Sequence, residues 1–195
     1  MRTFIAVEIS EEVRKEIVQI QEELKKTEAD VKWVESKNMH LTLKFLGEVE
    51  AEKIELIKEN LRRITQEIKS FEIAFQGLGV FPNLEFPRVV WVGIEKGKEE
   101  MVKLAMKIDD ELQKLGFPKE RRPFSCHLTL GRVRSSKNRD KLKRAIKERE
   151  NFKIKSIMDL KECILFRSQL TPAGPIYTAL AQFNLSSTPG VEEIR

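Results

Sequence analysis

The tetrapeptide His-Leu-Thr-Leu occurs twice, at residues 40–43 and 127–130, and these two copies contain both histidines of the 195-residue chain. The surrounding sequence repeats the same order of patterns: an amphipathic helix, the histidine motif, a second helix, and then strand-like segments with a hairpin pattern. A duplicated chain of this kind can place two equivalent strands about a pseudo-twofold axis. The duplication therefore constrains the fold more than any other feature of the sequence.

Each motif is predicted to be a β-strand. Because side chains alternate across a strand, His40 and Thr42 should share one face. The opposite face is apolar and should enter the core, with Leu41, Leu43 and Phe45 on it. In the second copy, Ser125, His127 and Thr129 should project together, opposite the intervening leucines. Each polar face is left for a groove or for solvent.

Four helices are predicted from apolar residues spaced three and four apart, and Ser10 is a suitable N-cap for the first. The stripes are Val13, Ile17, Ile20 and Leu24; Ile54, Ile57, Leu61, Ile64 and Ile68; Met101, Leu104, Ile108, Leu112 and Leu115; and Leu142, Ala145 and Ile146. Hairpins are expected over 79–94 and 163–181. We therefore predict an α+β, bilobal, duplicated fold: a single domain over 1–195 with two antiparallel sheets about a pseudo-twofold cleft and helices on the outside.

The paired histidines suit a reaction that removes one proton and delivers another at the same centre, because imidazole titrates near neutrality. A hydroxyl two residues after each imidazole supplies a neutral donor for an oxyanion such as a phosphate. In-line displacement at phosphorus needs a proton removed from the nucleophile and one delivered to the leaving group on the far side, with donors that stabilise the equatorial oxygens. Two such strands facing each other would supply all four groups. The alternative for either motif alone is a half-buried strand whose polar side chains merely form hydrogen bonds.

Several segments together resemble a known family. They are the paired motifs, the opening Arg2-Thr-Phe-Ile-Ala-Val, the segment Arg122-Pro-Phe-Ser-Cys-His-Leu-Thr-Leu-Gly-Arg132, and the end of the chain over 165–177. The chain resembles the 2H phosphoesterases over nearly its whole length. Within them it is similar to the RNA 2′,3′-cyclic phosphodiesterases, historically called 2′-5′ RNA ligases. One departure is Cys126, where this group often has proline; it should lie off the face of the histidine.

The resemblance implies metal-independent hydrolysis of RNA 2′,3′-cyclic phosphate ends to the 2′-phosphate, with no cofactor and no metal site. By motif, His40 is the proton donor to the departing 3′-oxygen, and His127 is the proton acceptor that activates water. Thr42 and Thr129 hold the non-bridging phosphate oxygens. Arg132 matches an arginine common in the family and is expected to bind substrate. Which histidine starts protonated rests on the resemblance alone.

Few aromatic rings are available for base recognition. Tyr177 and Phe81 lie at predicted turn or strand-end positions, where a ring could stack on a base, and both are candidate substrate-binding residues; the alternative is core or turn packing. Trp33 and Trp91 lie among valines and are predicted to be core residues. Residues 174–175, Gly-Pro, are predicted to form a turn.

The net charge of +5 is concentrated in one stretch after the second motif. Its basic residues are Arg132, Arg134, Lys137, Arg139, Lys141, Lys143, Arg144 and Lys147. Such a run is either a solvated helix face or a rim that attracts RNA phosphates through counterion release. The expected partner is RNA with 2′,3′-cyclic phosphate ends, tRNA fragments among them.

The rest of the composition narrows the class of protein. No apolar run reaches the length of a membrane span and the start lacks the build of a signal peptide, so we expect a cytoplasmic protein without a membrane partner, and a monomer. Two distant cysteines without a Cys-x-x-Cys motif predict buried, reduced thiols and argue against a disulfide or zinc site. Abundant Lys and Glu suggest a thermophile. Two further functions stay open: the reverse reaction, 2′-5′ ligation, and a non-catalytic RNA- or nucleotide-binding module.

Overall fold

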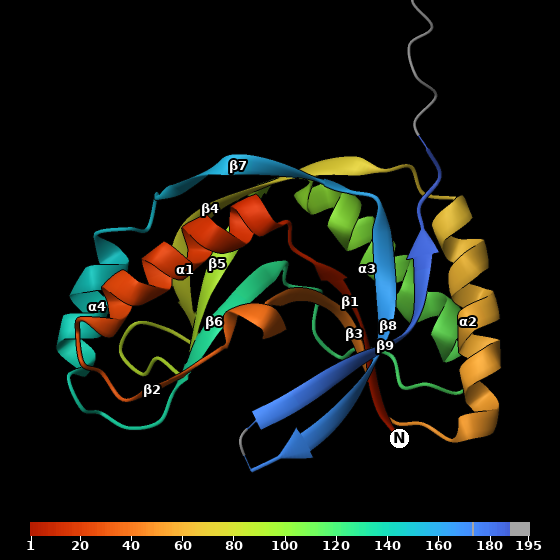
Figure 1. Cartoon of the computed structure of the whole chain (residues 1–195), viewed down its shortest axis with the longest axis horizontal. Coiled ribbons are helices and arrows are strands. Elements are labelled where there is room, and N and C mark those ends of the chain that lie inside the picture. Colours follow the sequence, from red (N-terminus) through yellow and green to blue (C-terminus); the bar gives the residue numbers. More distant parts are fainter. Residues whose placement is uncertain (173, 188–195) are drawn as a thin grey trace, which may run out of the picture.

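Two antiparallel sheets form the framework of the molecule, a computed structural model that describes residues 1–172 and 174–187 (Figure 1). The four-stranded sheet has the order β3 (His40–Glu48), β1 (Arg2–Glu8), β8 (Glu162–Thr171) and β9 (Gly174–Asn184). The five-stranded sheet has the order β2 (Val31–Trp33), β6 (His127–Val133), β5 (Val89–Lys96), β4 (Phe71–Phe81) and β7 (Lys153–Leu160). The α+β prediction with two antiparallel sheets is confirmed, while the end of the predicted domain at residue 195 lies outside the described residues.

Four α-helices cover the sheets on the outside, as predicted (Figure 1). α1 (Glu11–Lys25) and α4 (Arg139–Lys147) pack on the five-stranded sheet, and α2 (Ala51–Gln66) and α3 (Lys98–Gln113) pack on the four-stranded sheet. The hydroxyl of Ser10 accepts a hydrogen bond from the backbone N–H of Val13 at 3.3 Å, so the predicted N-cap is confirmed. The predicted apolar stripes form the buried faces of the helices, except that Ile68 and Leu115 lie beyond the ends of α2 and α3 and, like Ala145 of α4, are only partly buried. No helix among the described residues is long and apolar enough to cross a membrane.

The two halves of the sequence do not form one sheet each. β1 and β3 belong to the four-stranded sheet, yet α1, which connects them, packs against β7 of the other sheet. In the second half, β5 and β6 belong to the five-stranded sheet, yet the connecting helix α3 packs against β3. Because each helix crosses to the opposite sheet, the two lobes are interlocked.

Both motifs are strands, but the predicted place of Phe45 in the core is wrong, because its side chain is 60% exposed. The pairing of β3 with β1 shifts by one residue at Leu43. This β-bulge reverses the alternation of side chains, so that Lys44 is buried and Phe45 turns outward. The pairing of β6 with β5 shifts at the matching residue, Leu130, and turns Arg132 onto the histidine face.

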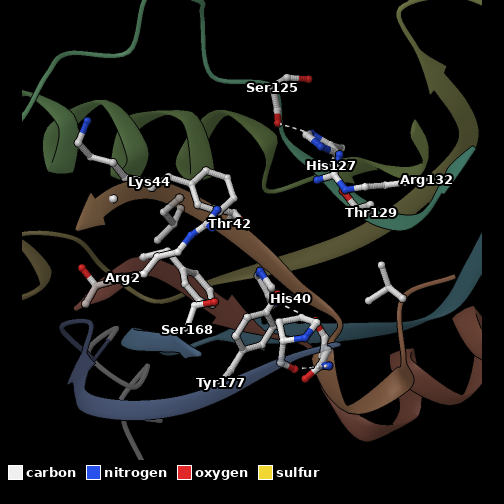
Figure 2. Close-up of a pocket in the computed structure, with 18 of the residues that line it drawn as sticks. Arg2, His40, Thr42, Lys44, Ser125, His127, Thr129, Arg132, Ser168 and Tyr177 are labelled. Carbon is white, nitrogen blue, oxygen red and sulfur yellow. Dashed lines mark hydrogen bonds between the residues drawn. The ribbon is translucent and has the colours of Figure 1, made fainter. Parts of the chain in front are cut away.

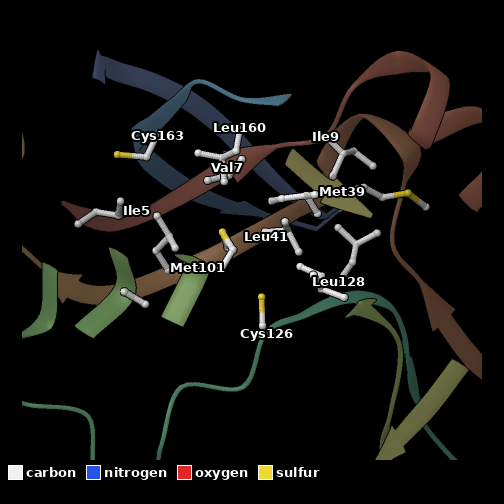
Figure 3. Close-up of a cluster of buried hydrophobic side chains, with 14 of the residues drawn as sticks. Ile5, Val7, Ile9, Met39, Leu41, Met101, Cys126, Leu128, Leu160 and Cys163 are labelled. Atoms are coloured by element: carbon white, nitrogen blue, oxygen red, sulfur yellow. The ribbon is translucent and has the colours of Figure 1, made fainter. Parts of the chain in front are cut away.

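A single large apolar core joins the two lobes (Figure 3). The leucines of both histidine motifs lie in it, as predicted. Cys126 and Cys163 are buried free thiols, and Cys126 points into the core and not into the histidine face. Burial raises the pKa of each thiol to about 12, so both are neutral and unreactive at physiological pH. The prediction that both cysteines are buried is confirmed.

Candidate active site

A cavity of about 600 Å³ lies between the two sheets and receives side chains from both; we refer to it as the cleft. Figure 2 shows His127, Thr129 and Arg132 on one side of it, and His40 and Tyr177 on the other. The polar and aromatic residues that line it include Arg2, Phe4, Lys32, Trp33, Glu35, Asn38, His40, Thr42, Phe45, Glu120, Arg122, Ser125, His127, Thr129, Arg132, Ser168 and Tyr177. The prediction that the two motifs face one cleft is therefore correct in this structure.

The two imidazole rings are held by the same local hydrogen bond. Nδ1 of His40 lies 2.7 Å from the carbonyl oxygen of Asn38, and Nδ1 of His127 lies 2.7 Å from the carbonyl oxygen of Ser125 (Figure 2). A carbonyl oxygen can only accept, so Nδ1 carries a proton in both rings. This fixes the tautomer and leaves Nε2 of each ring to exchange a proton.

Aromatic rings flank each histidine and remove water from it. The ring of Tyr177 meets His40 edge-on, with centroids 5.3 Å apart, and Phe4 contacts the same imidazole at 5.0 Å. Phe81 meets His127 edge-on at 5.0 Å. Burial lowers the pKa of both histidines below the usual 6.5, and the hydrogen bonds to the backbone carbonyls oppose that shift.

These shifts lead to a first prediction. An NMR titration of the two imidazoles is expected to give pKa values below 6.5 for both His40 and His127. The positive charge of Arg132 contributes to the lowering at His127 alone. Arg132→Gln should therefore raise the pKa of His127 and leave that of His40 unchanged. Equal shifts at both rings in this variant would contradict the placement of the guanidinium.

Thr42 and Thr129 complete the two polar strand faces. Each lies two residues beyond its histidine on the same strand face and lines the cleft. Within the described part of the chain, neither hydroxyl forms a hydrogen bond to protein, so both can donate to a ligand in the cleft. The site thus offers two proton-transfer groups and two neutral donors from opposite sheets.

Exposed basic side chains converge on the cleft from distant parts of the sequence. They are Arg2 at the start of β1, Lys32 on β2, Arg122 in the loop before β6, and Arg132 on β6. In residues 1–172 and 174–187 none of these four forms an ion pair with an acidic side chain. The charges of Arg132 and Arg2 both act on Tyr177, whose phenol pKa is nevertheless raised by burial, so its hydroxyl is a neutral donor at physiological pH.

The structure separates the predicted substrate-binding residues into two groups. Arg132 and Tyr177 line the cleft. Phe81 does not line it and instead packs between His127 and Trp91, whose ring centroid is 5.2 Å away. Trp33 also differs from its predicted core position, because it packs on the core with one part and lines the cleft with another.

Two other sequence predictions require correction. Gly174 and Pro175 do not form the turn itself; they are the first residues of β9, pair with Thr171 and Leu170 of β8, and line the cleft. Trp91 is only partly buried and packs on Gly79, where a Cβ atom would approach the indole ring to 2.3 Å. The indole therefore requires glycine at that point of β4.

Apart from Arg132, the basic run after the second motif does not border the cleft. None of residues 134–147 lines it. Lys143 forms an ion pair with Glu85 at 2.9 Å, and the guanidinium of Arg139 lies 5.5 Å from the ring centroid of Phe86. This placement favours the solvated-face interpretation of the run.

Arg2, Phe45 and Arg122 line the cleft, although none of them was predicted from the sequence as a site residue. In the sequence, Arg2 and Arg122 could have been identified as site candidates only because they lie in segments that resemble the family. Phe45 could not have been identified, because simple alternation places it in the core. Among the described residues, no group of three or more His, Cys, Asp or Glu side chains is arranged to hold a metal ion.

Comparisons with known proteins agree with this geometry. The family described as LigT like Phosphoesterase matches the chain twice, over residues 7–91 and 92–177. The RNA 2′,3′-cyclic phosphodiesterase of Methanothermobacter thermautotrophicus is 44% identical over 185 residues, which cover 95% of this chain and 99% of that protein. The protein of the same name from Thermotoga maritima is 39% identical and covers 92% of this chain and 93% of its own length.

Solved structures show the same likeness. A protein structure from Thermus thermophilus has a TM-score of 0.82 at 30% identity, with 96% of this chain and 99% of that chain covered. The structure of E. coli LigT complexed with 3′-AMP has a TM-score of 0.75 at 27% identity, with 94% of this chain and 97% of that chain covered. The fold is therefore shared with both structures over nearly the whole length of this chain.

Proposed function

Because the chain belongs to the LigT-like 2H phosphoesterase family, we propose that it is a hydrolase that opens RNA 2′,3′-cyclic phosphate ends to 2′-phosphates. One observation carries the proposal: two imidazoles with the same tautomer reach one cleft from opposite sheets, each with a free threonine hydroxyl beside it. Relatives at 39–44% identity over nearly the whole chain bear that activity in their names. E. coli LigT has been solved with phosphate and with 3′-AMP, which agrees with a phosphate site in this cleft.

The proposed mechanism is in-line displacement at phosphorus. Nε2 of His127 accepts a proton from water as the water oxygen forms a bond to phosphorus. The bond from phosphorus to the ribose 3′-oxygen breaks, and Nε2 of His40 delivers a proton to that oxygen. The 2′-phosphate remains, and the histidines have exchanged protonation states. The assignment of donor and acceptor follows the family resemblance, because both rings are held alike.

The remaining polar groups stabilise charge in this scheme. The hydroxyls of Thr42 and Thr129 donate to the non-bridging oxygens, where negative charge gathers. Arg132 adds a positive charge on the side of His127, and Tyr177 adds a neutral donor on the side of His40. Phe81 then supports the ring of His127 by an edge contact and does not stack on a base. A non-catalytic binding module would need no second proton carrier.

The direct test is an assay with a nucleoside 2′,3′-cyclic phosphate in the presence of a chelator. We expect turnover to persist and the product to be the 2′-phosphate, because the proposed proton carriers and donors are all organic side chains. Chromatography that resolves the 2′- from the 3′-phosphate gives the readout. Complete loss in chelator with recovery on adding a divalent cation would contradict the mechanism. Adding an RNA with a 5′-hydroxyl to the same assay measures 2′-5′ ligation beside hydrolysis.

A second test concerns the path of the RNA. We propose that Arg2 and Arg122 contact RNA phosphates, because they line the cleft and form no ion pair with an acidic side chain of residues 1–172 and 174–187. The double variant Arg2→Ala/Arg122→Ala should weaken binding of an oligonucleotide and reduce the slope of log K against log salt by about two. The matched control, Lys141→Ala/Arg144→Ala on α4, removes the same charge away from the cleft and should leave that slope unchanged. If both double variants reduced the salt slope equally, the basic residues at the cleft and on α4 would attract RNA without a specific path.

Three features of the biological setting stay predictions. They are a cytoplasmic location, tRNA fragments as substrates and a monomeric state. The pattern of the cleft supports RNA in general, since it combines a phosphate site with unpaired basic side chains.

A further inference from the structure

Two helices each bury one polar side chain that the cleft does not use. Gln21 of α1 is 3% exposed, and Asp109 of α3 is 9% exposed. Each directly follows an isoleucine of the apolar stripe, Ile20 and Ile108, so they hold equivalent places in the two halves of the chain. Neither lines the cleft. A polar group buried in this way needs hydrogen-bond partners, and its partners show what it holds in place.

Gln21 connects the strand that follows His127 to the segment that precedes His40. Its Nε2 donates to the carbonyl oxygen of Val34 at 2.8 Å and to that of Leu130 at 3.0 Å. The backbone N–H of Val34 donates to the same Leu130 carbonyl at 2.9 Å. Leu130 is the bulged residue three positions beyond His127, while Val34 opens the segment that leads to His40. We call these bonds the Gln21 clamp.

Lys44 and Asp109 form the reciprocal connection. The Lys44 ammonium forms a buried ion pair with Asp109 and donates to the carbonyl oxygen of Pro118 at 2.9 Å. The Asp109 carboxylate also accepts from the backbone N–H of Glu120 at 3.2 Å. Lys44 follows the bulge of β3, and the other two partners belong to the loop that leads to His127. We call this set the Lys44 clamp.

We propose that these two clamps position His40 and His127 relative to each other across the cleft, an inference that rests on the proposed function of the site. Each clamp ties the strand that follows one histidine to the segment that enters the other. In-line displacement needs the proton donor and acceptor on opposite sides of phosphorus, and a misplacement of about 1 Å can cost about a hundredfold in rate. Gln21, Lys44 and Asp109 are therefore positioning residues.

The clamps act at the points where backbone pairing alone is weakest. A β-bulge leaves one residue of the strand unpaired and locally interrupts the ladder of hydrogen bonds. A shift at the bulge of β6 would turn Arg132 away from the cleft, and one at β3 would turn Phe45 into the core. The hydrogen bond from Gln21 of α1 to Leu130, and the ion pair of Asp109 of α3 with Lys44, hold the observed register. Supporting bonds of this kind keep catalytic groups within the small tolerance that catalysis needs.

Hydrogen exchange of the protein without substrate tests the clamps independently of activity. Gln21→Leu keeps the size of the side chain and removes its donors. We expect faster exchange in peptides that cover residues 34–40 and 128–134, and no change in residues 114–126. The paired change Lys44→Met/Asp109→Leu leaves no buried charge unpaired. It should speed exchange in residues 114–126 and 42–48 and leave residues 128–134 unchanged.

A matched control is Thr65→Val, which removes a buried hydroxyl of α2 that bonds only within its own helix. It should alter neither set of peptides. Steady-state assays on a mononucleotide cyclic phosphate should then show a drop in kcat of about tenfold or more for each clamp variant, with KM changed by less than about threefold. Thr65→Val should keep the kcat of the unchanged protein even if its Tm falls.

The outcomes separate the two ideas. Unchanged exchange at the flanking segments of both histidines, or a kcat of the clamp variants equal to that of Thr65→Val, would overturn the positioning role. If the clamp variants exchange as described but the wild-type protein hydrolyses no cyclic phosphate, the proposed function is overturned and the clamps remain as observed structure. Faster local exchange together with a selective fall in kcat would establish the inference.

Discussion

Replacing either His40 or His127 by alanine is expected to lower kcat on a nucleoside 2′,3′-cyclic phosphate by on the order of a hundredfold or more, because general acid-base assistance typically contributes that much. The two rings act in one step, so the double variant should be little worse than either single one. Both side chains face the cleft and leave the leucine core untouched, so the variants should fold. Circular dichroism and Tm measurements check this.

The pH dependence of the residual activity distinguishes the two roles. The proton acceptor supplies the limb of kcat/KM that rises with pH, and the proton donor supplies the limb that falls. Since burial lowers both pKa values, both limbs of the unchanged enzyme should lie below about pH 6.5 in kcat/KM. His127→Ala should remove the rising limb, and His40→Ala the falling one. A folded His127→Ala protein with near-normal hydrolysis would show that this ring is not the base.

The second large effect is expected at the two threonines. Thr42→Val and Thr129→Val keep the shape of the side chain and remove the hydroxyl, and each should lower kcat by about a hundredfold, the typical effect of losing one donor to a developing oxyanion. The matched controls Thr42→Ser and Thr129→Ser retain the donor and should keep most of the activity. Assays at saturating substrate measure kcat separately from KM. A valine variant as active as its serine counterpart would show that the hydroxyl does not contact the phosphate.

The effects of the valine substitutions should be larger than that of His40→Ala when phosphate binding is measured without turnover. A threonine donor contributes to ground-state binding of phosphate as well as to the transition state. Competition by inorganic phosphate should therefore weaken in both valine variants. His40→Ala should change this competition less, because its proton is delivered to the leaving oxygen.

Much of the site could be predicted from the sequence because its information is local. The strand alternation of His-Leu-Thr-Leu puts each histidine and threonine on one face, and the structure retains that face in both copies. The spacing of apolar residues predicted all four helices, and the cap at Ser10 was predicted from one hydroxyl. The duplication predicted two antiparallel sheets with the motifs facing each other.

Simple alternation failed one residue beyond each motif. The bulges at Leu43 and Leu130 turn Phe45 and Arg132 toward the cleft, and alternation alone would place both in the core. Arg132 was nevertheless a candidate because of the resemblance to the family, and it lines the cleft. The resemblance to the family did not point to Phe45. A bulge depends on the register of a partner strand, which is far away in the sequence.

By itself the sequence determined which side chains are the candidates for the chemistry and which of them share a strand face, since motif, alternation and helical period are properties of neighbouring residues. Only the tertiary structure decided what surrounds them. It brought Arg2 and Arg122 to the cleft, left the basic helix α4 outside it, and placed Phe81 against an imidazole. It also crossed α1 and α3 to the opposite sheet, where Gln21 and Asp109 reach the other half of the chain. These outcomes depend on contacts between residues distant in the sequence, and no local pattern encodes such contacts.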